Sequence, residues 1–226
     1  MDPASLDILY EDSALLFVNK PAGIVVQRGY DAEEPVLLEV AMQHTQPLFL
    51  MQRLDRGTSG VMFFSKLASI NANLTRQFEG KRIRKRYVAI CEGELAEKQT
   101  IDAPLIRIGP ISFGVGDGGK RALTIVTPLR ATPAGSLVAV DLLTGRTHQI
   151  RVHLAAIGHP LAGDWLYGQR NEVRPMLHAR KLSMTHPLTN EPLRVAAPVP
   201  DDFRETAAER GIASRSEDIM TLCESG

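Results

Sequence analysis

Apolar residues gather in short runs along the chain, and most of these runs predict β-strands. Residues 14–26 (ALLFVNKPAGIVV) hold two apolar runs around Pro21 and Gly23, which predicts a strand, a tight turn and a second strand. Further strands are predicted over residues 61–66, 86–95, 121–132, 136–144 and 177–187.

Two segments instead carry the spacing of an amphipathic helix. In the first, apolar residues recur every three or four positions, at Leu67, Ile70, Leu74 and Phe78. Gly80 is the expected stop of this helix. The second covers residues 146–160 and has its buried stripe at Ile150, Leu154 and Ile157. Gly158 followed by Pro160 is expected to end it.

The order of these elements is strands, helix, several strands, helix, strands. It predicts an α+β fold with a large mixed but mainly antiparallel central sheet, flanked by helices and loops. A doubly wound fold would need a regular alternation of strands and helices, which is not the pattern here. We expect one domain over residues 1–203. Residues 204–226 are expected to form a loosely attached acidic tail, helical or disordered.

The composition is that of an ordinary globular protein. The 226 residues, of which 44% are hydrophobic and 23% charged, suffice for one large domain or two small ones. No apolar run approaches the roughly 20 residues of a membrane helix, and residues 1–12 lack a signal-peptide pattern. Cys91 and Cys223 have no framework spacing, which favours a reducing, cytoplasmic setting.

The net charge is zero, but the charges are distributed unevenly. Residues 76–87 hold six basic side chains and one acidic side chain, whereas residues 201–226 hold seven acidic and three basic ones. A run of like charges is usually a solvated face. Because the basic run adjoins a predicted strand, a phosphate-contacting patch is the competing interpretation.

One carboxylate stands out among the polar residues. Asp55 lies in the glycine-rich stretch QRLDRGTSG, with Arg53 and Arg56 close by. A turn aspartate that accepts backbone hydrogen bonds is the simplest interpretation. Nearby guanidinium groups would keep the carboxylate ionised, and an ionised, positioned carboxylate can act as a nucleophile or base. The spacing does not decide which arginine faces Asp55.

The second helical segment and Tyr87 are further candidates for chemistry. Arg151 lies four residues after Thr147, on the same face of the predicted helix. A solvent-facing arginine is the simple alternative for Arg151, as an interface or core tyrosine is for Tyr87. A zinc site at the three histidines of residues 148–159 is disfavoured, because their spacing does not align on one helical face.

Five stretches of the chain resemble, in order, the signature motifs of the RluA-type family of RNA pseudouridine synthases. They are ILYEDSALLFVNKPAGIVV, QRLDRGTSG, RKRYVAICEG, GRTHQIRVHLAAIGHPLAGDWLYG and LHARKLSMTHPLTNEPLRVAAPVPDDF. The resemblance covers residues 6–203 and implies the pseudouridine synthase fold. In one departure, Gln52 replaces the usual histidine before the Arg-Leu-Asp motif; glutamine can hydrogen-bond but does not titrate near neutrality. We also expect a catalytic domain without the N-terminal RNA-binding domain of many relatives.

The resemblance implies an isomerase that converts uridine in RNA to pseudouridine without a metal or cofactor. Asp55 matches the family's essential aspartate, as a nucleophile at the ribose or as a base. Arg151 matches the arginine expected to pair with this aspartate, and Tyr87 the tyrosine that stacks on the target base. Ile150 matches an apolar pocket residue, and Arg53 the position that fills the gap left by a flipped-out base.

The expected partner is a stem-loop of ribosomal or transfer RNA, and the chain is expected to be a monomer. Lys20 and the basic residues Arg82, Arg84 and Lys85 are natural phosphate contacts. For Lys20, a turn lysine exposed to solvent is an equally good interpretation. The alternatives are a catalytically silent RNA-binding protein of the same fold and a carboxylate-nucleophile glycosidase, in which Asp164 would be the second carboxylate.

Overall fold

The computed structural model describes residues 6–28, 36–169, 174–214, 219 and 221. The chain divides into two compact units, each built from two stretches of sequence. Unit 1 consists of Met1–Lys85 and Ala179–Pro198, and unit 2 of Arg86–His178 and Val199–Gly226. Within the described residues, no helix is both long and apolar enough to span a membrane.

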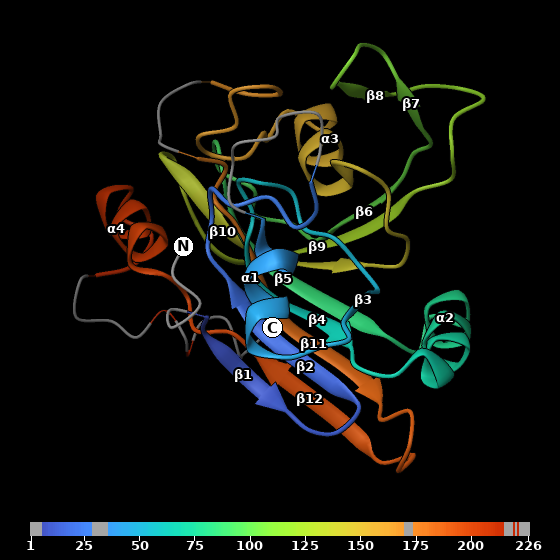
Figure 1. Ribbon diagram of the computed structural model, residues 1–226. Coiled ribbons are helices and arrows are strands. Elements are labelled where there is room, and N and C mark those ends of the chain that lie inside the picture. Colours follow the sequence, from blue (N-terminus) through green and yellow to red (C-terminus); the bar gives the residue numbers. More distant parts are fainter. Residues whose placement is uncertain (1–5, 29–35, 170–173, 215–218, 220, 222–226) are drawn as a thin grey trace. The chain divides into compact units, whose positions relative to one another are not determined.

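In unit 1, α-helices accompany a sheet (Figure 1). Its strands run in the order β1-β2-β4-β11, with β3 paired to β4 and β12 paired to β11. The strands are β1 (Ile8–Glu11), β2 (Leu15–Lys20), β3 (Phe49–Leu50), β4 (Ser59–Ser65), β11 (Leu177–Thr185, whose first two residues belong to unit 2) and β12 (Pro192–Ala196). The helices are α1 (Leu37–His44), the short 3-10 helix η2 (Ala68–Ile70) and α2 (Asn71–Glu79).

The core of unit 1 lies around β2 and β4, which pair in antiparallel fashion. All residues of β4 are buried, which explains why its sequence is a continuous apolar run rather than an alternating one. Phe63 stacks on Phe17 of β2 at a ring-centroid distance of 5.1 Å and on Phe78 of α2 at 6.2 Å. These contacts fix α2 on the sheet, and α2 ends at Gly80, as the sequence predicts.

Unit 2 contains the antiparallel strand order β5-β10-β9-β6, a separate β7–β8 hairpin and two helices. The strands are β5 (Arg84–Cys91, whose first two residues belong to unit 1), β6 (Gln99–Asp102), β7 (Leu105–Arg107), β8 (Phe113–Val115), β9 (Leu123–Thr132) and β10 (Gly135–Leu142). The helices are α3 (Gln149–Ala156) and α4 (Asp201–Glu209). The four α-helices and mainly antiparallel strands found in the described part of the chain confirm the predicted α+β class.

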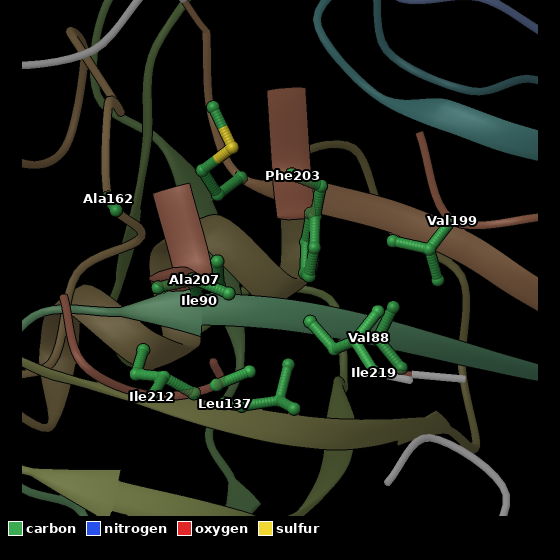
Figure 2. Close-up of a cluster of buried hydrophobic side chains, with 11 residues drawn as sticks. Val88, Ile90, Leu137, Ala162, Val199, Phe203, Ala207, Ile212 and Ile219 are labelled. Carbon is green, nitrogen blue, oxygen red and sulfur yellow. The ribbon is translucent and has the colours of Figure 1, made fainter. Parts of the chain in front are cut away.

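The core of unit 2 includes α4, contrary to the predicted loose tail. Figure 2 shows Phe203 and Ala207 of α4 together with Val88 and Ile90 of β5, and all four side chains are buried. Ile212 belongs to the same cluster and is 0% exposed. The predicted boundary after residue 203 therefore falls inside a packed helix. The acidic residues that suggested a tail lie mostly on its exposed side.

Among the described residues, the strand predicted over residues 24–26 is not found, whereas the second predicted helix is. The second strand expected over residues 24–26 is absent from this described segment, where Val25 makes only an isolated parallel bridge to Val36. The apolar run packs as a loop instead, with Ile24 and Val26 buried. The second predicted helix is confirmed as α3, and the chain leaves it at Gly158, whose φ of +83° is typical of a glycine after a helix.

Candidate active site

Asp55 lies on the loop of residues 51–58, which enters β4 of unit 1. The side chain is half-buried, and the Asp55 carbonyl accepts the N–H of Thr58 at 3.0 Å, which closes a turn. The exit of the loop is fixed by Gly60, where φ is +114° and an added Cβ would lie 2.3 Å from the Ala179 carbonyl oxygen. Only glycine lets β4 approach the neighbouring backbone this closely. Gly60, five residues after Asp55, thus has a backbone function.

Lys20 is buried beneath this loop, which corrects its predicted contact with phosphate. The side chain is 0% exposed, and Nζ donates to the carbonyls of Pro21 (2.8 Å), Arg56 (3.2 Å) and Thr58 (2.9 Å). A buried ammonium group is tolerated only when it is hydrogen-bonded in this way. Neither a phosphate contact nor a solvent-exposed turn lysine fits this position. Lys20 instead ties the end of β2 to the backbone on the far side of Asp55.

The exposed Arg56 also joins the loop of Asp55 to the turn after Lys20. Its Nε donates to the carbonyl of Gly23 at 3.1 Å, and its own carbonyl accepts the Gly23 N–H at 2.8 Å. The turn after Lys20 and the loop of Asp55 are therefore joined in both directions. This contact could not be predicted from the sequence, because its two residues are 33 positions apart.

The two residues before Leu54 have contrasting environments. Arg53 is exposed, as a contact with RNA would require. Gln52 is only 9% exposed, and neither its amide oxygen nor its amide nitrogen has a hydrogen-bond partner among the described residues. A buried amide without partners reduces stability. Gln52, which stands where the family usually has histidine, therefore lowers the stability of the fold.

The basic run does not form one uniform face. Arg82 and Arg84 are exposed, whereas Ile83 between them is buried. Lys85 is half-buried, its Nζ lies 5.3 Å from the centroid of the Phe78 ring, and burial lowers its pKa. Arg86 begins the part of β5 in unit 2 and pairs with Asp141 of β10, with Nε and Nη2 at 3.0 and 2.9 Å from the carboxylate oxygens.

Three predicted site residues lie in unit 2, on β5 and α3. Tyr87 is 6% exposed and lies opposite Val140 in the β5–β10 pair. Ile150 and Arg151 are in the first turn of α3, 4% and 5% exposed. The predicted alternative of a solvent-facing Arg151 is therefore wrong.

Gln149 fixes the beginning of α3. Its amide nitrogen donates to the Leu123 carbonyl at 3.1 Å and to Thr124 Oγ1 at 2.9 Å. Its amide oxygen accepts the Thr144 hydroxyl at 2.8 Å and the Arg146 N–H at 3.0 Å. All four hydrogen-bonding positions of this buried side chain join the helix to β9 and to the preceding loop. The residues that directly follow Gln149 are thereby held in place.

Arg151 forms a buried bidentate ion pair with Asp164, which the sequence did not connect to it. Nε and Nη2 of Arg151 each lie 2.7 Å from an Asp164 oxygen, and the Asp164 side chain is 0% exposed. The guanidinium carbon lies 5.0 Å from the centre of the Tyr167 ring. Such planar two-point contacts fix an arginine more precisely than a single hydrogen bond. Because both oxygens of Asp164 bind Arg151, Asp164 is not available as the second carboxylic acid that a glycosidase would need.

Tyr167, beside this ion pair, belongs to a cluster of rings with His148 and Phe113. The Tyr167 hydroxyl accepts the N–H of Phe113 at 2.9 Å and hydrogen-bonds to Nδ1 of His148 at 2.8 Å. His148 adopts a left-handed backbone conformation (φ +57°) directly before α3. His153 is bound elsewhere, by Thr124 and the Ala103 carbonyl, and His159 by the Glu92 carbonyl. The three histidines thus bind different partners.

Comparison with known proteins identifies the family. The model for RNA pseudouridylate synthase matches residues 14–156, a span that contains every predicted site residue. The chain belongs to the RNA pseudouridylate synthase family. The resemblance to the RluA-type synthases is thus confirmed, and the family makes the chain an isomerase that converts uridine to pseudouridine in RNA. Asp164 lies outside the matched span.

Individual relatives agree with this assignment. The chain is 41% identical to the uncharacterized RNA pseudouridine synthase YhcT of Bacillus subtilis, over 88% of this chain and 70% of the relative. It is 36% identical to ribosomal large subunit pseudouridine synthase D of Nitrosomonas europaea, over 88% of this chain and 63% of that protein. The solved structure of human RNA Pseudouridylate Synthase Domain Containing 1 superposes with a TM-score of 0.75 at 28% identity, covering 88% of this chain and 85% of that chain.

Proposed function

We propose that this synthase isomerises specific uridines in ribosomal RNA, transfer RNA or both, with Asp55 as the nucleophile or base that acts on a flipped-out uridine. Ribosomal RNA is favoured because a relative that is 36% identical is named a ribosomal large subunit pseudouridine synthase. The reaction breaks the glycosidic bond, turns the uracil and joins its carbon to the ribose. A positioned carboxylate is the group that such chemistry needs at the sugar.

The observation that best supports Asp55 is the anchoring of its loop. Lys20 donates hydrogen bonds to the carbonyls of Arg56 and Thr58, so the backbone just after Asp55 is bound to a buried cation. A carboxylate on a fixed loop loses little freedom when the substrate arrives, which favours reaction at the ribose. Half-burial leaves Asp55 open to a ligand while keeping it partly out of solvent.

The other roles follow from the family motifs. Arg151 is the arginine that the family motifs pair with the essential aspartate, and Asp164 would fix its guanidinium through the paired 2.7 Å contacts. Tyr87 would stack on the target uracil, and Ile150 would line the pocket. Flipping a base out of a stack requires a few kcal/mol, and the exposed Arg53 would fill the gap that the base leaves.

Contacts with the RNA backbone are assigned to the exposed part of the basic run. Arg82 and Arg84 present their guanidinium groups to solvent, and Lys85 lies half-buried beside them. Phosphate contacts of this kind position an RNA without reading its sequence. Lys20 is removed from this group because it is buried. The expected cytoplasmic location and monomeric state remain predictions.

The reaction is tested with RNA that carries tritium at carbon 5 of its uridines. Isomerisation replaces the hydrogen at this carbon, so the enzyme should release tritium from large-subunit ribosomal RNA or from transfer RNA. Binding of the RNA without release would instead identify a silent binding protein. Sequencing of pseudouridines in total RNA from a deletion strain and its parent would then name the modified position.

A further inference from the structure

The turn after Asp164 exposes Trp165, the only tryptophan of the chain. Its exposed fraction is 47%. Tryptophan is on average a well-buried residue, and it is enriched at sites where proteins contact other molecules. Its exposed area makes Trp165 a candidate for contact with another molecule.

The backbone that carries Trp165 is held rigidly. Oδ1 of Asp164 accepts the N–H groups of Leu166 and Tyr167 at 3.1 and 3.2 Å, and the Asp164 carbonyl accepts the N–H of Gly168 at 2.8 Å. The same carboxylate binds Arg151. Trp165 thus directly follows Asp164, the residue that binds the predicted catalytic Arg151. A side chain on a backbone that is already ordered loses less entropy on binding than one on a mobile loop.

The β7–β8 hairpin adjoins this turn and exposes more apolar area. Phe113 of β8 donates its N–H to the Tyr167 hydroxyl, which joins the hairpin to the turn. Seven large hydrophobic residues are exposed among those the structure describes, and four of them lie here: Ile108, Ile111, Val115 and Trp165. Residues 105–115 and 164–167 are called the hairpin–turn surface below. Grouped exposed apolar residues mark interaction sites, whereas single ones do not.

The charges next to the hairpin–turn surface indicate the class of partner. Residues 102–121 and 145–147 expose more basic than acidic side chains. The basic ones are Arg107, Lys120, Arg121 and Arg146, and the acidic ones are Asp102 and Asp117. Backbone contacts hold them beside the hairpin, since the Lys120 N–H donates to the Leu105 carbonyl and Nε of Arg146 donates to the Arg121 carbonyl. Aromatic and apolar side chains combined with cations are the chemistry that binds unpaired nucleic acid.

We propose that the hairpin–turn surface binds unpaired nucleotides of the substrate RNA and that Trp165 stacks on a nucleobase. The inference rests on the proposed function and adds a binding residue that the family motifs do not assign. Stacking needs only the face of a base, so it tolerates sequence variation. The contact would hold the RNA beside Arg151 without taking part in the bond changes.

The single tryptophan supplies the measurement. Poly(U), which offers unpaired bases, should quench the fluorescence of Trp165 as it binds. Inorganic polyphosphate carries the charge without the bases, so it should compete for the cations but leave the fluorescence almost unchanged. Fluorescence that stays constant at saturating poly(U), or equal quenching by polyphosphate, would overturn the proposal.

Substitutions test the affinity. Trp165→Ala should bind labelled poly(U) about tenfold more weakly, whereas Trp165→Phe should keep most of the affinity because it keeps an aromatic face. Leu188→Ala is the matched control, since Leu188 is also exposed (49%) but lies in unit 1, and it should bind like the wild type. Thermal unfolding checks that each variant is folded. Unchanged affinity in Trp165→Ala, with or without a change in self-association by sedimentation, would overturn the RNA contact.

The outcome separates this inference from the proposed function. If the wild type releases tritium from uridine-labelled ribosomal RNA while Trp165→Ala binds poly(U) normally, only the stacking proposal fails. If the wild type releases none from ribosomal or transfer RNA, the proposed function fails, whatever the fluorescence shows.

Discussion

In each unit, a buried charged side chain fixes a candidate site residue or the backbone beside it. Lys20 binds the backbone on one side of Asp55, and Asp164 binds the guanidinium of Arg151. Both contacts join residues through the folded backbone, without any regular spacing in the sequence. The motifs could therefore indicate Asp55 and Arg151 but not the residues that position them. For Asp164, the only signal was its place in the same motif as Arg151.

Replacement of Asp164 by asparagine tests this positioning. Asp164→Asn keeps the size of the side chain but removes the charge that pairs with a buried guanidinium, so we expect a loss of about 3 kcal/mol in the free energy of unfolding. The rate of pseudouridine formation should fall while the affinity for RNA changes little. Denaturant unfolding and single-turnover tritium release measure the two effects.

The matched control for this prediction is Asp141→Asn. Asp141 also pairs with an arginine, Arg86, but 37% of its side chain is exposed. Such exposed pairs contribute at most about 1 kcal/mol. Equal losses of stability in the two variants would contradict the role assigned to Asp164, as would an unchanged reaction rate in Asp164→Asn.

At the level of elements, the spacing of apolar residues predicted α2, α3 and the long strands well. It failed where a short apolar run can pack in more than one way. Residues 24–26 are apolar enough for a strand, but Pro21 and Gly23 lead the chain into a loop that makes only one bridge. For α4, the acidic composition concealed a narrow apolar stripe, because only a few of its residues face the core.

The packing of α4 predicts that the C-terminal segment stabilises unit 2. Phe203→Ala removes a fully buried ring from the cluster in Figure 2 and should lower the free energy of unfolding by about 3–5 kcal/mol. Glu205→Ala, on the exposed side of the same helix, should change it by no more than about 0.5 kcal/mol. If both variants unfold at the denaturant concentration of the wild type, α4 is the loose tail that its composition suggests.

A buried histidine makes the stability of the α3 region depend on pH. Burial lowers the pKa of His153 from its ordinary value of 6.5. The unfolded chain then takes up the proton more readily, so stability is complete above about pH 6.5 and falls as the pH drops from there through the lower folded-state pKa. His153→Gln should flatten this part of the curve. Parallel curves for wild type and variant, from denaturant unfolding across this range, would rule out His153 as the cause.

For the molecule as a whole, the net charge of zero conceals a basic region balanced by acids elsewhere. The sequence indicated the α+β class, the family and the residues of its motifs, because these depend on patterns along the chain. It did not reveal the two discontinuous units, since their boundaries depend on contacts between distant segments. Nor did it reveal that Lys20 is buried, because an Asn-Lys-Pro turn is polar in most settings.

The exposed basic residues should set the dependence of RNA binding on salt. Each phosphate contact that is lost reduces the slope of log K against log salt by about 1 or slightly less. The triple variant Arg82→Ala, Arg84→Ala and Lys85→Ala should therefore bind RNA more weakly at low salt and with a slope shallower by about 2–3. A salt titration by fluorescence anisotropy measures the slope. An unchanged slope would mean that this run is only a solvated face.

The most direct test of the whole account is the activity of Asp55→Asn. Asparagine nearly keeps the shape of the side chain but cannot act as the nucleophile or base. We expect this variant to fold and bind RNA like the wild type, yet to release no tritium from carbon 5 of labelled uridines. Tritium release at the wild-type rate, with pseudouridine present in the product, would contradict the central role of Asp55.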